Sequence, residues 1–137
     1  MDEFLFAKRS RLEFCVHRAR ACAALPSVLP FEQDETRHDA AGLSVLRAIE
    51  LAIGIATYVI HKRGLDVPQS SRASFDLLER EEVISTKLAS ELKSMVDFKN
   101  LLVLRHTELK PQTLLEVIES RLDHLVEFSR VVLASEA

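Results

Sequence analysis

The chain has 137 residues, enough for one domain whose hydrophobic core needs neither a metal ion nor a disulfide. It is 47% apolar with only three glycines, which excludes a disordered or low-complexity chain. The formal net charge of −3 excludes a globally basic nucleic-acid binder, so any RNA contact must come from a local basic patch. We therefore expect residues 1–137 to form a single domain.

The first predicted helix covers residues 4–24. Its apolar stripe recurs at helical spacing and consists of Leu5, Leu12, Val16, Ala19 and Ala23. The remaining surface carries the cations Lys8, Arg9, Arg11, Arg18 and Arg20. They form either an ordinary solvated face or a patch that attracts RNA or an acidic partner, and both interpretations stay open. Pro26 and Pro30 are expected to end the helix.

The two cysteines, Cys15 and Cys22, both fall in this helix. Seven helical residues span about 10.5 Å, which exceeds the Cα separation of about 7 Å that a disulfide tolerates. Free thiols are typical of a reducing compartment, and the charged N-terminal segment is unlike a signal peptide. The longest apolar run, residues 51–60, is shorter than the roughly 20 residues of a membrane span. These features predict a cytoplasmic protein.

A second helix is predicted from an N-cap at Asp34 or Thr36 to about residue 63. One apolar face consists of Leu43, Leu46, Ile49, Ile53, Ala56 and Ile60, and it is widened by Leu51, Ile55 and Val59. A helix with so broad an apolar surface is expected at the centre of its domain or at a subunit interface. Gly64 follows it as the expected C-terminal residue.

Metal and cofactor sites are not indicated. His17, His61 and His124 stand singly, without a second ligand at the spacing that helical metal sites use. A cofactor-binding four-helix bundle needs paired inward carboxylates and histidines, which Glu50 and His61 do not supply. We therefore expect neither a metal ion nor a cofactor.

Three further helices are predicted. Ser70 or Ser71 caps a short third helix to about residue 80, and Ser85 begins the fourth helix. Pro111 opens a fifth helix that runs to the C-terminus, with a stripe of Leu115, Ile118, Leu122, Leu125, Phe128 and Val132. No strand pattern accompanies these helices. The predicted fold class is all-α, an antiparallel bundle of four or five helices with one short connecting helix.

The end of the fourth helix carries the residues best suited to chemistry. Lys99 and Asn100 precede an apolar run at 101–104 that we expect to be buried, and Arg105 and His106 follow it. On a straight helix Lys99 and His106 share nearly one face, about 10.5 Å apart. Arg105 is suited to clamp a phosphate, and His106 can exchange a proton near neutral pH. The alternative is a helix that simply ends in a polar turn, and spacing alone favours it.

Residues 67–111 resemble the HepT-like branch of the HEPN superfamily, small helical ribonuclease toxins paired with a minimal nucleotidyltransferase (MNT) antitoxin. The matching residues are Val67, Pro68, Phe75 to Leu78, Ile84, Ser85, Leu88, Leu92, Met95, Val96, Phe98, Asn100 and Val103. Arg47 and Glu50 resemble the family's Arg-x-x-Glu pattern in the second helix, so the resemblance covers most of the chain from about Leu43.

The resemblance implies a homodimeric toxin that cleaves RNA without metal at a dimer-interface site, using the 2′-hydroxyl as nucleophile, and that binds an MNT-type antitoxin. The family motif is Arg-x4-His-x-Tyr. Ungapped comparison places Lys99 at the Arg position, Leu104 at the His position and His106 at the Tyr position. A shifted motif, Lys99-x6-His106, is the other possibility. We prefer the ungapped comparison, because lysine does not replace a bidentate arginine and leucine transfers no proton.

The site implied by this comparison consists of Lys99, Asn100, Leu104, Arg105 and His106. Ribonuclease activity is therefore expected to be impaired, and the alternative is an inactive dimeric module that only binds its nucleotidyltransferase-type partner. Gly54, Thr57 and Tyr58 also stand where many relatives carry Asp, Asn and His. Relatives are silenced by AMP transfer to the motif tyrosine, a route that is closed at His106 in this chain.

Overall fold

The computed structural model describes residues 1–136, which form six α-helices and two short 3-10 helices. In chain order the elements are α1 (Glu3–Ala24), η1 (Phe31–Gln33), α2 (Glu35–Lys62), α3 (Ser71–Arg80), α4 (Thr86–Leu104), η2 (His106–Glu108), α5 (Pro111–Ser120) and α6 (Asp123–Ser135). Residues 1–136 contain no β-strand, so the predicted all-α fold class is confirmed.

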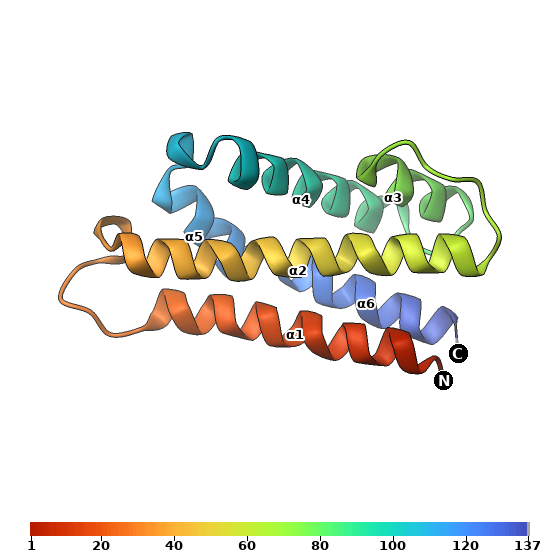
Figure 1. Cartoon of the computed structure of the whole chain (residues 1–137), viewed down its shortest axis with the longest axis horizontal. Coiled ribbons are helices and arrows are strands. Elements are labelled where there is room, and N and C mark those ends of the chain that lie inside the picture. The colour runs from red at the N-terminus through yellow and green to blue at the C-terminus, as the bar shows by residue number, and fades with distance from the viewer. Residues whose placement is uncertain (137) are drawn as a thin grey trace.

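Helix α2 is the central element of the bundle (Figure 1). It contacts each of the other five α-helices. Helix α1 lies antiparallel along one side of α2, and α4 runs antiparallel along the other side. Helix α3 lies beside the C-terminal end of α2, while α5 and α6 pass behind it. The central position expected from the broad apolar surface of α2 is therefore confirmed.

Most helix ends form where local chemistry predicts them. The side chains of Asp34, Ser70 and Ser85 each accept a hydrogen bond from a backbone N–H three residues later, at 3.1 to 3.2 Å. Pro111 occupies the first position of α5, where its missing N–H removes no helical hydrogen bond. Gly64 follows α2 with φ of +68°, a left-handed conformation that glycine adopts without steric cost.

The C-terminal segment differs from the single helix that we predicted. A turn at Arg121 and Leu122 separates α5 from α6, with Arg121 at φ −120° and ψ −17°. The Arg121 guanidinium donates a hydrogen bond to Ser94 Oγ and lies 4.0 Å from the Glu91 carboxylate, both on α4. These contacts with another helix hold the turn. The buried apolar spacing continues across it, which is why the pattern predicted one uninterrupted helix.

The core is one continuous cluster, and Phe75 and Phe128 meet edge to face in it at 5.4 Å. The predicted stripe of α1 is confirmed, with four of its residues buried and Ala23 partly buried. The prediction for α2 is wrong in part, because Leu43 is 47% exposed. Its core face contains the predicted Ala56 and also the small residues Ala41, Ala48 and Ala52, which were not predicted. Cys15 and Cys22 are free, buried thiols.

Helix α2 also meets the length and composition of a membrane span. Its 28 residues include a window with mean hydropathy 1.8. Half of that window is buried against the rest of the bundle, and the core helices of soluble proteins pass the same test. The feature is therefore weak evidence for membrane insertion.

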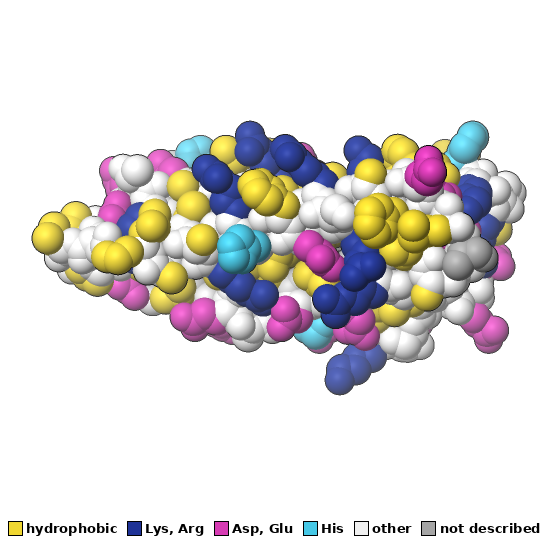
Figure 2. Space-filling model, turned by 90° about the horizontal axis from the view of Figure 1, so that it is seen from below, with side chains coloured by type: hydrophobic (Ala, Val, Ile, Leu, Met, Phe, Trp, Pro, Cys, Tyr) yellow, Lys and Arg dark blue, Asp and Glu magenta, His cyan; other side chains and the backbone are white. Residues whose placement is uncertain are grey.

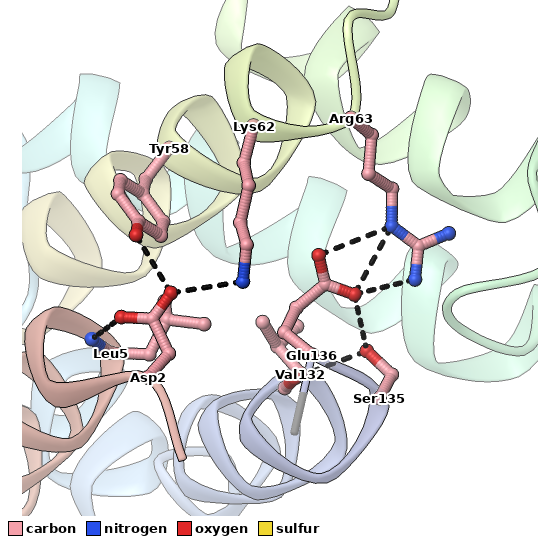
Figure 3. Close-up of polar contacts among 8 residues, drawn as sticks. All are labelled: Asp2, Leu5, Tyr58, Lys62, Arg63, Val132, Ser135 and Glu136. Carbon is pink, nitrogen blue, oxygen red and sulfur yellow. Dashed lines mark hydrogen bonds and ion pairs between the residues drawn. The ribbon is translucent and has the colours of Figure 1, made fainter.

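Polar contacts tie Asp2 and Glu136 to the C-terminal end of α2 (Figure 3). Asp2 accepts hydrogen bonds from Tyr58 at 2.7 Å and Lys62 at 3.0 Å. The Tyr58 bond, helped by the backbone N–H of Leu5, lowers the pKa of Asp2 to about 2. Glu136 pairs with Arg63 at 2.6 Å, which lowers the pKa of the Glu136 carboxyl. Both ends of the described chain are thus anchored to α2.

Candidate functional site

Helix α4 carries the residues that the sequence singled out, and close packing holds its C-terminal end against α2. A Cβ added at Gly42 would lie 3.7 Å from Leu114 and 3.8 Å from Leu102, so α2, α5 and α4 meet at this point. Both are ordinary van der Waals distances, so the side chains of Leu102 and Leu114 already lie within contact range of this position. The C-terminal end of α4 therefore lies beside the N-terminal third of α2.

Lys99 and Asn100 lie in the last two turns of α4. Lys99 is partly buried and forms no ion pair with any residue in 1–136, and Asn100 is exposed. Because α4 runs antiparallel to α2 and Leu102 is level with Gly42, Lys99 lies about level with residues 45–47. An unpaired cation is therefore available beside the middle of α2.

The expectation that residues 101–104 are buried is wrong. Leu101 and Leu102 are partly buried, whereas Val103 is 49% exposed and Leu104 is 77% exposed. A third exposed apolar side chain, Leu43, belongs to α2 and follows Gly42, the residue that contacts the end of α4. Leu43, Val103 and Leu104 are called the apolar patch below. Exposed apolar side chains gathered at one place mark contact surfaces more often than isolated ones do.

The helical face predicted to carry both Lys99 and His106 does not extend to His106. Helix α4 ends at Leu104, and Arg105 leaves the helical region at φ −138° and ψ 37°. Arg105 lies 3.7 Å from Glu108, its partner within η2. His106 begins η2 and is exposed. The straight-helix geometry considered for Lys99 and His106 is therefore wrong, because the backbone turns between them.

His106 lines a hollow of about 630 Å³ at the N-terminal end of α2. The acidic side chains around this hollow are Glu32, Asp34, Glu35 and Asp39, and His38 also lines it. These carboxylates repel a phosphate, so electrostatic repulsion of an anion is weaker on the Lys99 side of α4. Within one protomer, the five candidate residues are close along the chain, but α4 ends between Lys99 and His106.

A second surface lies next to α4, along the solvent-exposed face of α2. The exposed residues of that face recur at helical spacing and are Leu43, Arg47, Glu50, Gly54, Thr57 and His61. Arg47 and Glu50 also line a groove of about 440 Å³ between α1 and α2. Its other lining residues are Phe4, Lys8, Arg11, Cys15, Leu51 and Gly54, and it is called the α1/α2 groove below.

The cations of α1 form two groups, apart from Arg18, which is exposed, forms no ion pair within residues 1–136 and does not line the groove. Arg9 pairs with Glu13 at 3.1 Å and Arg20 pairs with Asp123 at 2.9 Å, as ordinary surface cations do. Lys8 and Arg11 form no ion pair within residues 1–136 and line the groove. Seen from the α1 side, Lys and Arg side chains gather with hydrophobic side chains between them (Figure 2).

Sequence reasoning noticed the α1 cations but not their partner on α2. Arg47 joins Lys8 and Arg11 only because α1 and α2 pack side by side. No local pattern links positions so far apart in the chain. In the described part of the chain, no group of three His, Cys, Asp or Glu side chains is arranged to hold a metal ion.

Comparison with known proteins supplies the family. A sequence model of the ribonuclease HepT-like family matches residues 17–132. The mRNA nuclease HepT of Shewanella oneidensis is 31% identical over 134 residues, covering 98% of this chain and 99% of that protein. Among solved structures, the tri-AMPylated Shewanella oneidensis HEPN toxin in complex with MNT antitoxin superposes with a TM-score of 0.89. That match has 30% identity and covers 98% and 99% of the two chains.

Two further structures agree with this match. A toxin–antitoxin complex with AMP-PNP gives a TM-score of 0.88 at 30% identity, over 96% of this chain and 99% of the other. The cytosolic protein of unknown function YutE from Bacillus subtilis gives 0.76 at 19% identity, over 94% and 87% of the chains, which supports the fold alone. Sequence identity of 31% over nearly the full length, a matching family model and a shared fold lead to one conclusion. This chain belongs to the HepT-like ribonuclease family.

Proposed function

We propose that this chain is the toxin component of a HEPN/MNT-type toxin–antitoxin pair and a metal-independent endoribonuclease of reduced activity. The observation that carries the proposal is the 31% identity with an mRNA nuclease over 98% of the chain. The partner is a nucleotidyltransferase-type antitoxin, and the MNT antitoxin bound to the structurally similar HEPN toxin supports it. The protein is proposed to act in the cytoplasm as a single domain.

The proposed reaction is cleavage of an RNA strand. The 2′-hydroxyl attacks the adjacent phosphorus, the bond to the 5′-oxygen breaks, and a proton reaches that leaving oxygen. The products are a 2′,3′-cyclic phosphate and a 5′-hydroxyl. Lys99 binds the phosphate, Asn100 positions it, and Arg105 and His106 stabilise or protonate the leaving group. No redox partner is needed, since every atom comes from the RNA.

The proposed site requires a second copy of the chain. The backbone turns at Arg105, so Lys99 and His106 do not share one continuous helical face, and residues of a second protomer would complete the site. The apolar patch of Leu43, Val103 and Leu104 is exposed beside these residues and supports a homodimer contact there. In such a dimer, each phosphate would meet residues of both protomers.

The residue at position 104 supports reduced activity. If Leu104 stands where relatives carry the catalytic histidine, the strongest proton-transfer group is missing. Lys99 offers a single point charge where an arginine would offer two parallel hydrogen bonds. Lys99 and Leu104 also favour the second candidate function. In that function the chain is an inactive dimeric module that only binds the antitoxin.

Cleavage assays distinguish the two functions. Labelled single-stranded and structured RNA are incubated with the purified chain, with and without a chelator. The nuclease function predicts slow, chelator-resistant cutting that His106→Ala reduces. Cutting that the chelator abolishes, or that His106→Ala leaves unchanged, contradicts the proposed site. In cells, growth arrest only after Lys99→Arg, Leu104→His and His106→Tyr are combined would support the inactive module.

A further inference from the structure

The α1/α2 groove gathers three cations that form no ion pair within residues 1–136. Most Lys and Arg side chains of residues 1–136 pair with a carboxylate within 4.0 Å. Lys8, Arg11 and Arg47 do not, and all three line this one groove, where Glu50 is the single carboxylate. Unpaired cations that converge from two helices are a ready counter-charge for an anionic ligand.

Aromatic rings hold two of these cations in place. Lys8 Nζ lies 5.2 Å from the centre of the Phe4 ring, and the Arg11 guanidinium lies 5.8 Å from that of Phe14. Such contacts attract a cation to a ring face and restrict its side chain. Phe4 itself stacks on Tyr58 at 4.3 Å, and Tyr58 is fixed by its hydrogen bond to Asp2 (Figure 3). The groove wall is therefore preorganised.

The floor of the groove is open and apolar. A Cβ added at Gly54 would meet no atom within 4 Å, so the glycine leaves a hollow beside Leu51 and Cys15. Phe4 is 44% exposed and forms one wall. A basic groove with an aromatic wall and an apolar floor is the arrangement by which proteins hold single-stranded nucleic acid without reading its sequence.

We infer that the α1/α2 groove binds single-stranded RNA, with backbone phosphates at Lys8, Arg11 and Arg47 and a base against the apolar floor at Leu51 and Gly54. The inference rests on the proposed function and extends it from the cleavage site to substrate positioning. The exposed face of α2 that carries Arg47 lies between α1 and α4, so a strand bound in the groove would continue across this face towards α4 (Figure 1). Phe4 and Tyr58 are positioning residues and not catalytic ones.

The test compares two double variants that remove the same charge. Arg11→Gln with Arg47→Gln empties the groove of two exposed, unpaired cations. Arg80→Gln with Lys87→Gln removes two exposed cations that also form no ion pair in residues 1–136 but lie outside the groove. Fluorescence anisotropy measures the binding of a labelled single-stranded RNA to each variant and to the wild type.

The groove variant is expected to bind at least about tenfold more weakly, with a salt-dependence slope smaller by about 1.4, because two single-strand phosphate contacts are lost. The control variant is expected to stay within about twofold of the wild type. Equal losses in both variants would overturn the inference, since the attraction would then depend only on net charge. Wild-type affinity in the groove variant would overturn it too.

Circular dichroism shows whether the groove variant keeps its helix content. If it does not, a second variant that changes no charge provides the test. Gly54→Leu fills the hollow without changing any charge or adding an aromatic ring, and it is also expected to weaken RNA binding about tenfold. Unchanged binding by Gly54→Leu would count against the groove.

Failure of the inference is distinguishable from failure of the proposed function. If the wild type cleaves RNA and both groove variants bind RNA as tightly as the wild type, the nuclease function is supported and the binding role of the groove is contradicted. If the wild type binds RNA through the groove but does not cleave it, the binding role is supported and the nuclease function is contradicted. If the wild type neither binds nor cleaves RNA, both are contradicted.

Discussion

Tyr58 donates a 2.7 Å hydrogen bond to Asp2, and its ring stacks on Phe4 at a centroid distance of 4.3 Å. One side chain of α2 therefore fixes both the N-cap of α1 and one wall of the α1/α2 groove. Asp2 caps α1 through the backbone N–H of Leu5 at the same time. The stability of this end of the bundle and the shape of the groove are thus linked through a single carboxylate.

Asp2→Asn is expected to destabilise the protein in a pH-dependent way. The pKa of Asp2 is lowered from 3.8 to about 2 in the folded state, chiefly by the Tyr58 hydrogen bond. A lowered folded-state pKa contributes stability that is fully present above about pH 4 and is lost as the pH falls towards 2. Urea unfolding at a series of pH values should show the wild type and the variant converging over that range.

Asp66→Asn is the matched control, because Asp66 is exposed and forms no ion pair in the described residues. Its difference from the wild type should be small at every pH. A gap between wild type and Asp2→Asn that stays constant down to the lowest pH would contradict the role given to the Asp2 carboxylate.

Leu104→His is expected to raise the rate of RNA cleavage by about 100-fold or more, since a positioned general acid or base typically contributes at least that much. Single-turnover cleavage of a labelled RNA in the presence of a chelator measures it. Val103→His is the control, because Val103 is the adjacent residue and is also exposed. Equal rates for the two variants would show that position 104 has no special place in the site.

Leu104→Glu is expected to weaken the proposed homodimer at least about tenfold, because it places a charge in an interface that would exclude water. Sedimentation analysis over a range of protein concentrations measures the dissociation constant. Val67→Glu is the control, since Val67 is 84% exposed and lies in the loop between α2 and α3. Dimers that tolerate both substitutions equally would place the subunit contact elsewhere on the molecule.

Two glycine substitutions are expected to change stability in opposite directions. Gly54→Ala should stabilise the protein by about 0.5 to 1 kcal/mol, because glycine within a helix is unfavourable and the added Cβ meets no atom within 4 Å. Gly64→Ala should destabilise it by about 1 kcal/mol, since φ is +68° there. Urea denaturation of each variant measures both changes. Similar signs for the two would contradict the conformations assigned.

The sequence predicted features that depend on local chemistry. The caps at Asp34, Ser70 and Ser85, the proline opening α5 and the glycine ending α2 are decided within one helical turn, and all are confirmed. Burial depends on neighbours that are distant in sequence. Leu43 and Leu104 therefore have apolar spacing that fits a core although they are exposed. The break between α5 and α6 at Arg121 depends on contacts with side chains of α4, so the local sequence around Arg121 does not predict it.

Residue types singled out the end of α4, and the family resemblance then gave Lys99, Leu104 and His106 their motif positions. The turn at Arg105 between Lys99 and His106 is a backbone conformation that residue types do not specify. The α1/α2 groove escaped prediction for a related reason. Its three cations come from two helices, and only tertiary packing brings them together.

The termination of α4 at Leu104 has an electrostatic consequence. The C-terminal end of a helix presents carbonyl oxygens and carries a partial charge of about −0.5, whereas phosphate-binding helices use the amide groups of their N-terminal end. A phosphate that approaches this end of α4 finds no backbone donor in the helix. In the proposed site, its binding would depend on the side chains of Lys99, Arg105 and His106. Catalysis at the proposed site would then be lost or regained through one or two substitutions while the fold stays the same.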